Sequence, residues 1–575
     1  MAVTLWLRTL TPVHIGTGNK VSPEEYYFSN NKCYRINLNK CFFFLGSKLG
    51  YDYLNDKLNE WSEHIAENFK LSDSTKSRAE YKLSIFDFVK DFLKNNSLSA
   101  ELRNLIENDP QYCLYCIDSS TKPWKEVVEI IKLSNKSPYI PGSSLKGVFR
   151  TALLYTAISE NLDELKEFIK KATKDLENHQ RAKANEKQKG NKDLGKKLDD
   201  DIVNHFFVCE SKGDGFDPKY DLLKFVSVCD AYLNEPVKNP FELASTELLL
   251  INARKQPQTP IVEFIKKGLV FKTEISVDFN ALKLIASQLK ENDFIYDNEN
   301  KDKKIWIDFK KKFNRLFKID VRDLIQNNNP LDLEKRIVER IMYALRKFSK
   351  DVLQWDLNWL GQVSSKKTQS GYSKHISDLE NVYNQHIKNS SNIFKIGWAS
   401  GFTATTVFLA LRNDPNNEAF LKNMLSEFIP KQKKKDRIDL NKFPTSRRLA
   451  YGVSPIGWLE FSPNAFHSDS FADTTQTRVS QQQNLKQPSV DVAKYPVEMK
   501  LTPQSKQIPA EVVDNSSKPI KIRLLIVGYE KETFHCSGVD NLASVPPGTK
   551  IFVNVSDYDK KKQQFRMFRF EREIK

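Results

Sequence analysis

The feature that most constrains the fold of this chain is a polar tract between residues 463 and 515. The tract is rich in Gln, Ser, Pro and Asp and has almost no regularly spaced apolar residues. Because a segment of this composition cannot bury enough apolar surface to join a packed core, it is typical of a linker. At 575 residues the chain is also too long for one compact core. We therefore predict that the tract is a linker between a large N-terminal part and a small C-terminal domain, 516–575.

The residues after the tract alternate between apolar and polar side chains in short runs. The four runs are KIRLLIVGYE, TFHCSGV, KIFVNVSDYD and QFRMFRFERE, and turn residues separate them. Alternation with a period of two is the pattern of half-buried strands. We expect a small β-barrel of the OB or SH3 type in this region.

Before the tract, strand patterns and helix patterns are mixed. VTLWLRTLTPVHIGTG alternates as a strand and breaks at Gly16 and Gly18, and further strand-like runs return between 222 and 279. Patterns with a period of 3.6 residues fill most of 280–390. Because both strands and helices are predicted before the tract, we expect a fold of the α+β class.

The charge balance of the chain favours a polyanionic partner. Lys and Arg total 89 against 73 acidic residues, a formal net charge of +16. A broad positive field most commonly serves to neutralise phosphates. The same excess is also compatible with a lysine-rich surface that only faces water, so the balance alone does not identify a ligand.

Several classes of protein do not fit this sequence. No run of about 18 apolar residues could span a bilayer, and the N-terminus lacks the basic segment of a secretory signal, so we expect a cytoplasmic protein without a membrane partner. The seven cysteines are scattered, which suits a reducing compartment. Cys113 and Cys116 form a lone C-x-x-C without a second ligand pair, so we expect neither a metal site nor a cofactor. Asp230 and Glu263 fall in strand-like runs and are interpreted as core or interface partners of basic residues.

The stretch PYIPGSSLKGVFRT at 138–151 predicts a helix that begins with positive charge. Ser143 or Ser144 is a suitable N-cap, and Lys146 and Arg150 follow without an acid in the first two turns. Helix N-termini carry free N–H groups and about half a positive charge, so a bound phosphate would relieve the repulsion. The alternative is a capped helix whose Lys and Arg face water.

Two other glycine-rich turns carry the same chemistry. TPVHIGTG ends a strand in two glycines beside His14, and KIGWASGF places a glycine-opened turn beside Lys395 and Trp398. Glycine lets a backbone approach a phosphate closely, and an aromatic ring can stack on an unpaired base. Three such elements favour an RNA ligand more than one element does.

Together with PTSRRL and PIGWLEF late in the sequence, these motifs resemble the RAMP superfamily of CRISPR–Cas proteins. The ordered combination is most similar to the Csm subgroup subunit that caps the 3′ side of the guide RNA in the type III-A effector complex. The resemblance spans about 1–462, and the residues after 462 fall outside it. It implies tandem RRM-like, ferredoxin-type modules with helical insertions, which we divide into 1–280 and 281–462.

The resemblance also implies a function. It predicts a noncatalytic RNA-binding subunit, with guide RNA and the backbone and small subunits of the complex as partners, that supports guide-RNA maturation and antiviral defence. It allows target RNA and a recruited maturation nuclease as further partners. The RNA-binding residues that it implies are His14, Gly16, Gly18, Ser143, Ser144, Lys146, Gly147, Arg150, Lys395, Gly397, Trp398, Ser400, Gly401, Arg447 and Arg448.

Two alternatives remain open from the sequence. Some RAMP relatives cleave guide precursors without a metal, and His14 is the one histidine that lies in a motif. Acid–base cleavage would need a second group near the leaving oxygen, whereas His14 at a strand end is also typical of a structural hydrogen bond. The second alternative is a scaffold whose basic surface only aids solubility.

Overall fold

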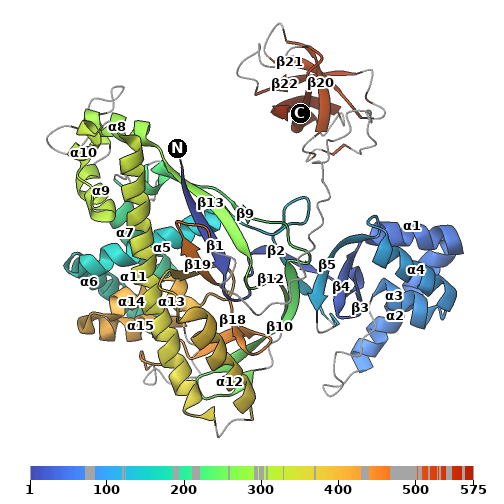
Figure 1. The fold of residues 1–575 in the computed structure, drawn as a ribbon, viewed down its shortest axis with the longest axis horizontal. Coiled ribbons are helices and arrows are strands. Elements are labelled where there is room, and N and C mark those ends of the chain that lie inside the picture. Colours follow the sequence, from blue (N-terminus) through green and yellow to red (C-terminus); the bar gives the residue numbers. More distant parts are fainter. Residues whose placement is uncertain are drawn as a thin grey trace. The chain divides into compact units, whose positions relative to one another are not determined.

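The computed structural model divides into two compact units, residues 1–472 and 473–575, which we describe separately. The structure describes residues 2–71, 84–119, 122–123, 125–185, 193–209, 220–256, 260–289, 295–296, 304–305, 308–327, 329–367, 371–428, 439–466, 501–502, 505, 508–515, 519–526, 529, 532–538, 547–559 and 564–573. Helices and strands are both abundant, which confirms the predicted α+β class (Figure 1).

The first unit contains a seven-stranded sheet whose strands come from distant parts of the chain. Its order is β16-β19-β1-β13-β9-β7, with β8 also paired to β13. The strands are β1 (Val3–Thr9), β7 (Tyr139–Ile140), β8 (Val226–Val228), β9 (Ala231–Leu233), β13 (Val270–Val277), β16 (Ile393–Lys395) and β19 (Trp458–Ser462). In β1, Leu5 and Leu7 point into the core, so alternation sets which face of the sheet is buried.

A ten-stranded sheet forms the second layer of β-structure in this unit. Its order is β2-β6-β12-β10-β5-β4-β3, with β11 and β17 paired to β10 and β18 paired to β17. The strands are β2 (Gly16–Val21), β3 (Tyr26–Ser29), β4 (Lys32–Ile36), β5 (Cys113–Ser119), β6 (Val127–Ile130), β10 (Phe241–Leu250), β11 (Lys255–Gln256), β12 (Ile261–Ile265), β17 (Ser446–Ala450) and β18 (Ser454–Pro455). Strands β14 (Ile295–Tyr296) and β15 (Lys304–Ile305) form a separate pair.

The helices of the unit gather in two places. Helices α1–α4 pack into their own hydrophobic cluster beside β3, β4 and β5, whereas α5 packs along the long helix α11 next to the seven-stranded sheet (Figure 1). The helices are α1 (Leu38–Leu49), α2 (Tyr51–Leu71), α3 (Ile85–Asp87), α4 (Asn96–Asn108), α5 (Gly142–Glu160), α6 (Leu162–Asn185), α7 (Asp193–Phe207), α8 (Phe279–Gln288), α9 (Phe309–Phe317), α10 (Val321–Gln326), α11 (Pro330–Ser364), α12 (Ser373–Val382), α13 (Phe402–Thr405), α14 (Phe408–Arg412) and α15 (Glu418–Phe428).

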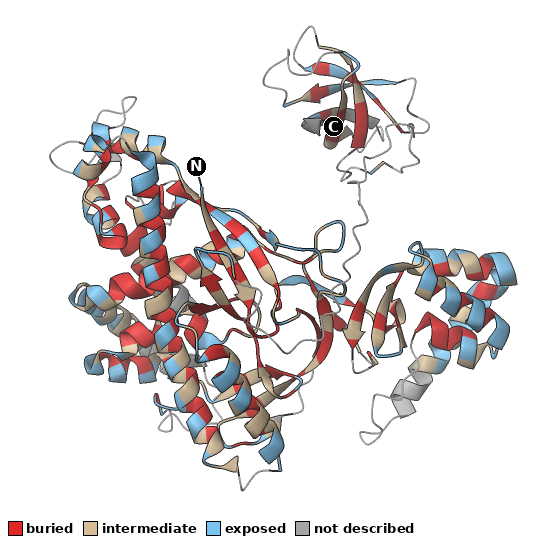
Figure 2. Cartoon of the chain, viewed as in Figure 1, coloured by how far each residue is buried: buried red, intermediate tan, exposed pale blue. Residues whose placement is uncertain are grey.

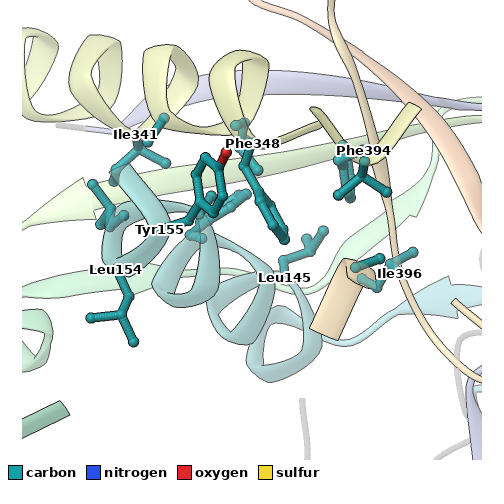
Figure 3. Packing of buried hydrophobic residues seen from close by; sticks show 14 of the residues in the cluster. Leu145, Leu154, Tyr155, Ile341, Phe348, Phe394 and Ile396 are labelled. Carbon is teal, nitrogen blue, oxygen red and sulfur yellow. The ribbon is translucent and has the colours of Figure 1, made fainter. Parts of the chain in front are cut away.

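The contact between α5 and α11 is the centre of the main hydrophobic core. Leu145 and Tyr155 of α5 and Phe348 of α11 belong to one buried cluster, which also contains Phe394 and Ile396 at the end of β16 (Figure 3). The rings of Tyr155 and Phe348 lie 4.9 Å apart between centroids. This packing fixes the start of α5 relative to the turn that follows β16. Buried and exposed residues alternate along the long helix α11 in Figure 2, whereas residues 152–158 of α5 are all buried.

The chain returns to its first strand after more than four hundred residues. Strand β1 pairs with β13 on one side and with β19 on the other, so residues of the predicted modules 1–280 and 281–462 are hydrogen-bonded neighbours in one sheet. The predicted boundary at residue 280 therefore does not coincide with a break in strand pairing. Because β19 lies between β1 and β16 in this sheet, the glycine-rich turns that follow β1 and β16 lie close together.

The second unit contains a closed five-stranded barrel with a core of its own. The strands run in the order β20-β21-β22-β24-β23 and close from β23 to β20. They are β20 (Ile508–Asp514), β21 (Ile520–Leu524), β22 (Thr533–Ser537), β23 (Lys550–Asp559) and β24 (Gln564–Glu573). Ile508, Ile522 and Phe568 are among the buried residues that fill it. This barrel agrees with the β-barrel that the alternating apolar and polar residues predicted.

The first barrel strand lies inside the segment that was predicted as a linker. Within 463–515, residues 467–500 lie outside the described residues, but β20 occupies 508–514. Its Ile508, Ala510 and Val512 alternate into the barrel core, although the adjoining polar residues obscure this pattern in the sequence. The barrel therefore begins before residue 516.

No helix among the described residues is long and apolar enough to cross a membrane. Within the same residues, no group of three or more His, Cys, Asp or Glu side chains is arranged to hold a metal ion. Cys113 and Cys116, the C-x-x-C pair, both lie on β5 as free thiols.

We predict that the barrel unfolds independently of the first unit. Replacing the fully buried Ile522 with Ala should destabilise the barrel by about 2–5 kcal/mol, because it removes buried methyl groups and leaves a cavity. In scanning calorimetry of the full chain, the barrel transition should move to lower temperature while the transition of the larger unit stays unchanged. Lys521→Ala on the exposed side of the same strand is the control, and a shift of both transitions by Ile522→Ala would contradict independent folding.

Candidate nucleic-acid interface

His14 lies at the centre of the region where the sequence motifs meet. The residue follows β1 and is buried, with 1% of its surface exposed. Its Nδ1 lies 2.7 Å from the carbonyl oxygen of Glu263. Because a carbonyl can only accept, Nδ1 carries the hydrogen and Nε2 is the unprotonated nitrogen. Burial lowers the pKa of His14, so the imidazole is neutral near pH 7.

Two glycines lie close to His14, one beside its imidazole ring and one beside its backbone carbonyl. A Cβ added to Gly16 would lie 2.8 Å from His14 Nε2, and a Cβ added to Gly397 would lie 2.3 Å from the His14 carbonyl oxygen. Gly397 also has a φ of +82°, a conformation that side chains disfavour. The amide of Trp398 donates to the same carbonyl at 2.8 Å. The glycines in TPVHIGTG and KIGWASGF are therefore needed for the two turns to contact each other through His14.

The late PIGW motif completes this junction. Gly457 donates its amide to the Pro12 carbonyl at 2.8 Å and accepts from the Ile396 amide at 2.9 Å. Its φ is +87°, and a Cβ there would lie 2.4 Å from the Ile396 oxygen. Three segments that are far apart in the sequence thus interlock around residues 12–14, 396–398 and 457.

The outer side of the junction carries an aromatic ring and a cation. The Arg448 guanidinium lies 5.3 Å from the centre of the Trp398 ring, and its Nη1 donates to Thr246 Oγ1 at 3.3 Å. Both Trp398 and Arg448 are half-buried, whereas Gly16, Gly18 and Gly401 are exposed. Ser400 is buried and donates its hydroxyl to the Gly397 carbonyl at 2.6 Å, which braces the turn from inside. The accessible groups are those that could meet a phosphate or a base.

Lys395 and Arg447, predicted to contact RNA, are instead internal. The carboxylate of Asp356 on α11 accepts from Lys395 Nζ at 2.6 Å and from Arg447 Nε at 2.8 Å, and Tyr383 donates its hydroxyl to it at 3.2 Å. Asp356 is 0% exposed and Lys395 is 6% exposed. Burial alone would raise the pKa of Asp356, but the two cations outweigh it and hold that pKa below its ordinary value. Contact with RNA would require breaking this ion triad, so the prediction is wrong for these two side chains.

The start of α5 differs from the predicted cap. The helix begins at Gly142 after Pro141, and neither Ser143 nor Ser144 acts as the N-cap. The Gly142 amide donates instead to Asp230 Oδ1 at 2.7 Å. A side chain at Gly142 would collide with the chain after β8, because its Cβ would lie 2.2 Å from the Val228 oxygen. The helix therefore begins ahead of the serines, in close contact with the end of β8, which the local sequence does not reveal.

The two cations of α5 also meet an acid from another segment. Arg150 Nη1 forms an ion pair with Asp221 Oδ2 at 2.6 Å, and its guanidinium lies 4.5 Å from the centre of the Phe207 ring. Lys146 is half-buried, and desolvation lowers its pKa. Ser143 and Gly147 remain exposed. Arg150 is therefore compensated by an acid from another segment, although α5 itself carries no acid in its first turn.

A second buried carboxylate lies directly beneath His14. Glu263 is 0% exposed and forms an ion pair with Lys132 Nζ at 2.5 Å. It also accepts from the Tyr26 and Tyr115 hydroxyls, each at 2.9 Å, and from the Ile130 amide at 3.0 Å. The interpretation of Glu263 as a core partner of a basic residue is confirmed. Asp230, by contrast, accepts from a backbone amide.

Comparison with known proteins agrees with this arrangement of motifs. The family model described as the RAMP superfamily matches residues 6–361. CRISPR system Cms protein Csm5 of Methanocaldococcus jannaschii is 22% identical over 470 residues, which cover 79% of this chain and 87% of that protein. The protein of the same name from Streptococcus thermophilus is 28% identical over 159 residues, which cover 26% of this chain and 38% of that protein.

Two solved structures match about four fifths of the chain. One chain of a Csm–crRNA–target RNA ternary complex of a type III-A CRISPR–Cas system matches with a TM-score of 0.46 and 22% identity, covering 80% of this chain and all of that one. The crystal structure of T. onnurineus Csm5 matches with a TM-score of 0.44 and 20% identity, covering 79% of this chain and 99% of that one. The predicted resemblance to a RAMP protein is confirmed, and the names of both relatives agree with the Csm subgroup.

We predict that the Asp356 triad contributes strongly to stability. Asp356→Asn should lower the free energy of unfolding of the first unit by about 3–5 kcal/mol, because it leaves two buried cations without a counter-charge. Denaturant titration of the purified chain measures this loss. Asp56→Asn, an exposed position on α2, is the matched control and should change stability by less than about 0.5 kcal/mol. Equal effects of the two variants would contradict the assigned role.

Proposed function

The chain belongs to the RAMP superfamily, and on that premise we propose that it is a noncatalytic RNA-binding subunit of a type III-A CRISPR effector complex. In this proposal it caps the 3′ side of the backbone that holds the guide RNA, and it supports guide-RNA maturation and antiviral defence. Guide RNA and the backbone and small subunits of the complex are its partners. The motif order and the shared name of the two relatives support the subunit assignment.

The observation that carries the proposal is the convergence of the glycine-rich turns on one buried residue, His14. The exposed glycines of these turns present backbone without side chains, which permits close approach to a phosphate. Beside them, the half-buried Trp398 ring and the Arg448 guanidinium offer stacking and charge. A strand held in this way would be bound through its backbone and with little dependence on base sequence.

The proposed RNA contacts are the members of the predicted set that retain exposed surface. They are Gly16, Gly18, Ser143, Ser144, Lys146, Gly147, Arg150, Trp398, Gly401 and Arg448. The remaining members shape the turns from inside or from behind. They are the buried His14, Lys395, Ser400 and Arg447, together with the half-buried Gly397, whose backbone packs against the His14 carbonyl.

The environment of His14 argues against the endoribonuclease alternative. A general base must come within about 2.6–3.2 Å of the group that loses its proton. His14 is almost fully buried, its Nδ1 is occupied by the Glu263 carbonyl, and its Nε2 faces the backbone of Gly16. The imidazole therefore acts as a positioning group for the two turns.

We predict that Arg448 contributes one phosphate contact. Arg448→Ala should weaken binding of unrelated single-stranded RNAs to a similar extent, and the slope of log affinity against log salt should fall by about 0.7. Fluorescence anisotropy over a salt series measures both effects. Arg322→Ala, which removes an exposed guanidinium from α10, is the control and should leave the slope unchanged. An unchanged slope for Arg448→Ala would remove this residue from the interface.

We also predict that the purified chain binds guide RNA without cutting precursor or target, with or without magnesium. The complex isolated from the native host should contain a short RNA with a repeat-derived 5′ end. His14→Ala should lower stability and RNA affinity together, because the turns lose their common support. Specific cleavage that disappears in His14→Ala while affinity is kept would overturn the proposal in favour of the endoribonuclease.

A further inference from the structure

The C-terminal barrel lies outside the matched family region and has the strand order of an OB fold. The family model ends at residue 361, whereas the barrel begins at β20. Four of its five strand pairs are antiparallel, and β22 and β24 are parallel neighbours. Numbered along the chain, the order is first, second, third, fifth and fourth strand, closing on the first. This is a five-stranded Greek-key barrel, whose second and third strands form the exposed face that binds oligonucleotides in proteins of this architecture.

The second and third strands, β21 and β22, present cations on the outside of the barrel. In β21, Ile520, Ile522 and Leu524 are buried, and Lys521 and Arg523 alternate with them as exposed residues. Lys521 is opposite His535 of β22, which is also exposed. Residues opposite each other on neighbouring strands share a face, so Lys521 and His535 lie side by side.

Strand β24 extends this surface on the other side of β22. His535 is opposite Met567, and Ser537 is opposite Arg569, which is exposed while the adjacent Phe568 is fully buried. Arg523 and Arg569 have no carboxylate within ion-pair distance among the described residues. Lys521 lies 3.7 Å from Asp514, but both side chains are largely exposed, and such surface pairs contribute little.

The charges on the outside of the barrel are unevenly distributed among the strands. The strands β21, β22 and β24 carry Lys521, Arg523, His535 and Arg569, which we call the cationic face, and β24 adds one exposed acid, Glu571. The other two strands carry the acids Glu511, Asp514 and Asp557 beside Lys550, and Glu511 and Asp514 border the cationic face because they are opposite Arg523 and Lys521. Neighbouring strands are about 4.8 Å apart and alternate residues on one strand about 6.6 Å, so the cations form a closely spaced group. A group of this kind matches the repeating charge of a phosphodiester chain.

Partly exposed aromatic rings accompany the same strands. Tyr529 lies immediately before β22, Phe534 is on β22 and Phe565 is on β24, and all three are half-buried. The Tyr529 ring lies 6.3 Å from that of Phe534 and 6.4 Å from that of Phe565, measured between centroids. Phe534 is opposite the buried Ile522, and all three rings pack against the barrel core, so the contribution of the cationic face is electrostatic.

We propose that the cationic face is a second RNA-binding surface, which holds the backbone of a single-stranded segment. Its existence rests on the geometry of the barrel alone, and the choice of RNA as its ligand rests on the function proposed above. Since Lys521, Arg523 and Arg569 contact phosphates and not base edges, the surface binds unpaired RNA with little sequence preference.

The test compares two triple variants of the full chain. Lys521→Ala, Arg523→Ala and Arg569→Ala together should lower the salt slope for an unstructured single-stranded RNA by about 2, since each lost phosphate contact accounts for about 0.7. The matched control replaces three exposed cations of the first unit with Ala: Arg322, Lys335 and Lys422. This control changes the net charge equally and should leave the slope as it is. A charge-conserving variant, Arg523→Lys with Arg569→Lys, should retain most of the binding.

The outcomes separate this inference from the proposed function. An unchanged slope in the barrel variant, or an equal fall in the control, would overturn the cationic face as a site. A duplex RNA that competes as well as the single strand would overturn its preference for unpaired RNA. Arg448→Ala is measured in parallel. If only Arg448→Ala lowers the salt slope, the barrel inference fails alone. If only the barrel variant lowers the salt slope, the proposed interface of the first unit fails. Calorimetry of the barrel variant confirms that its fold is intact.

Discussion

The hydrogen bond from the His14 imidazole to the Glu263 carbonyl holds the centre of the larger unit in place. It fixes the ring so that Nε2 faces Gly16, while the His14 carbonyl accepts the amide of Trp398. Glu263 in turn is held by Lys132 and two tyrosine hydroxyls. Because these contacts link residues near 14, 130, 263 and 398, they couple the glycine-rich turns to the two sheets. The exposed backbone of the turns therefore depends on a largely buried polar network.

Buried charge recurs on both sides of this junction, and each instance is compensated. Asp356 meets two cations and a hydroxyl, and Glu263 meets one cation, two hydroxyls and an amide. An isolated buried carboxylate would be strongly disfavoured, whereas a carboxylate with several donors can be retained. Such groups accept donors only in defined directions, so they specify one arrangement of the surrounding strands and helices more tightly than apolar packing would. This is a physical reason for placing polar groups beneath turns whose shape matters.

The sequence predicts those structural features that depend on residues close together in the chain. Alternation anticipated the barrel, and the stretch at 138–151 anticipated the helix α5. Composition and motif order anticipated the α+β class and the family. The glycines of the motifs could also be identified from the sequence. A glycine is visible there whichever segment packs against it in the fold.

Charge at the site could not be predicted in the same way, because the partners come from distant segments. The start of α5 reads as purely cationic, yet Asp230 and Asp221 reach it from segments about seventy to ninety residues later. Lys395 and Arg447 are cationic like Arg448, but their ion pairs with Asp356 hold them inside the protein. A basic residue in a motif therefore indicates that a negative charge lies nearby. The sequence does not show whether that charge is a carboxylate of the protein or a phosphate of a ligand.

On the barrel, by contrast, strand alternation alone assigns Lys521 and Arg523 to the outside, since their neighbours Ile520, Ile522 and Leu524 must fill the core. The outward position of these two cations therefore follows from the local sequence pattern.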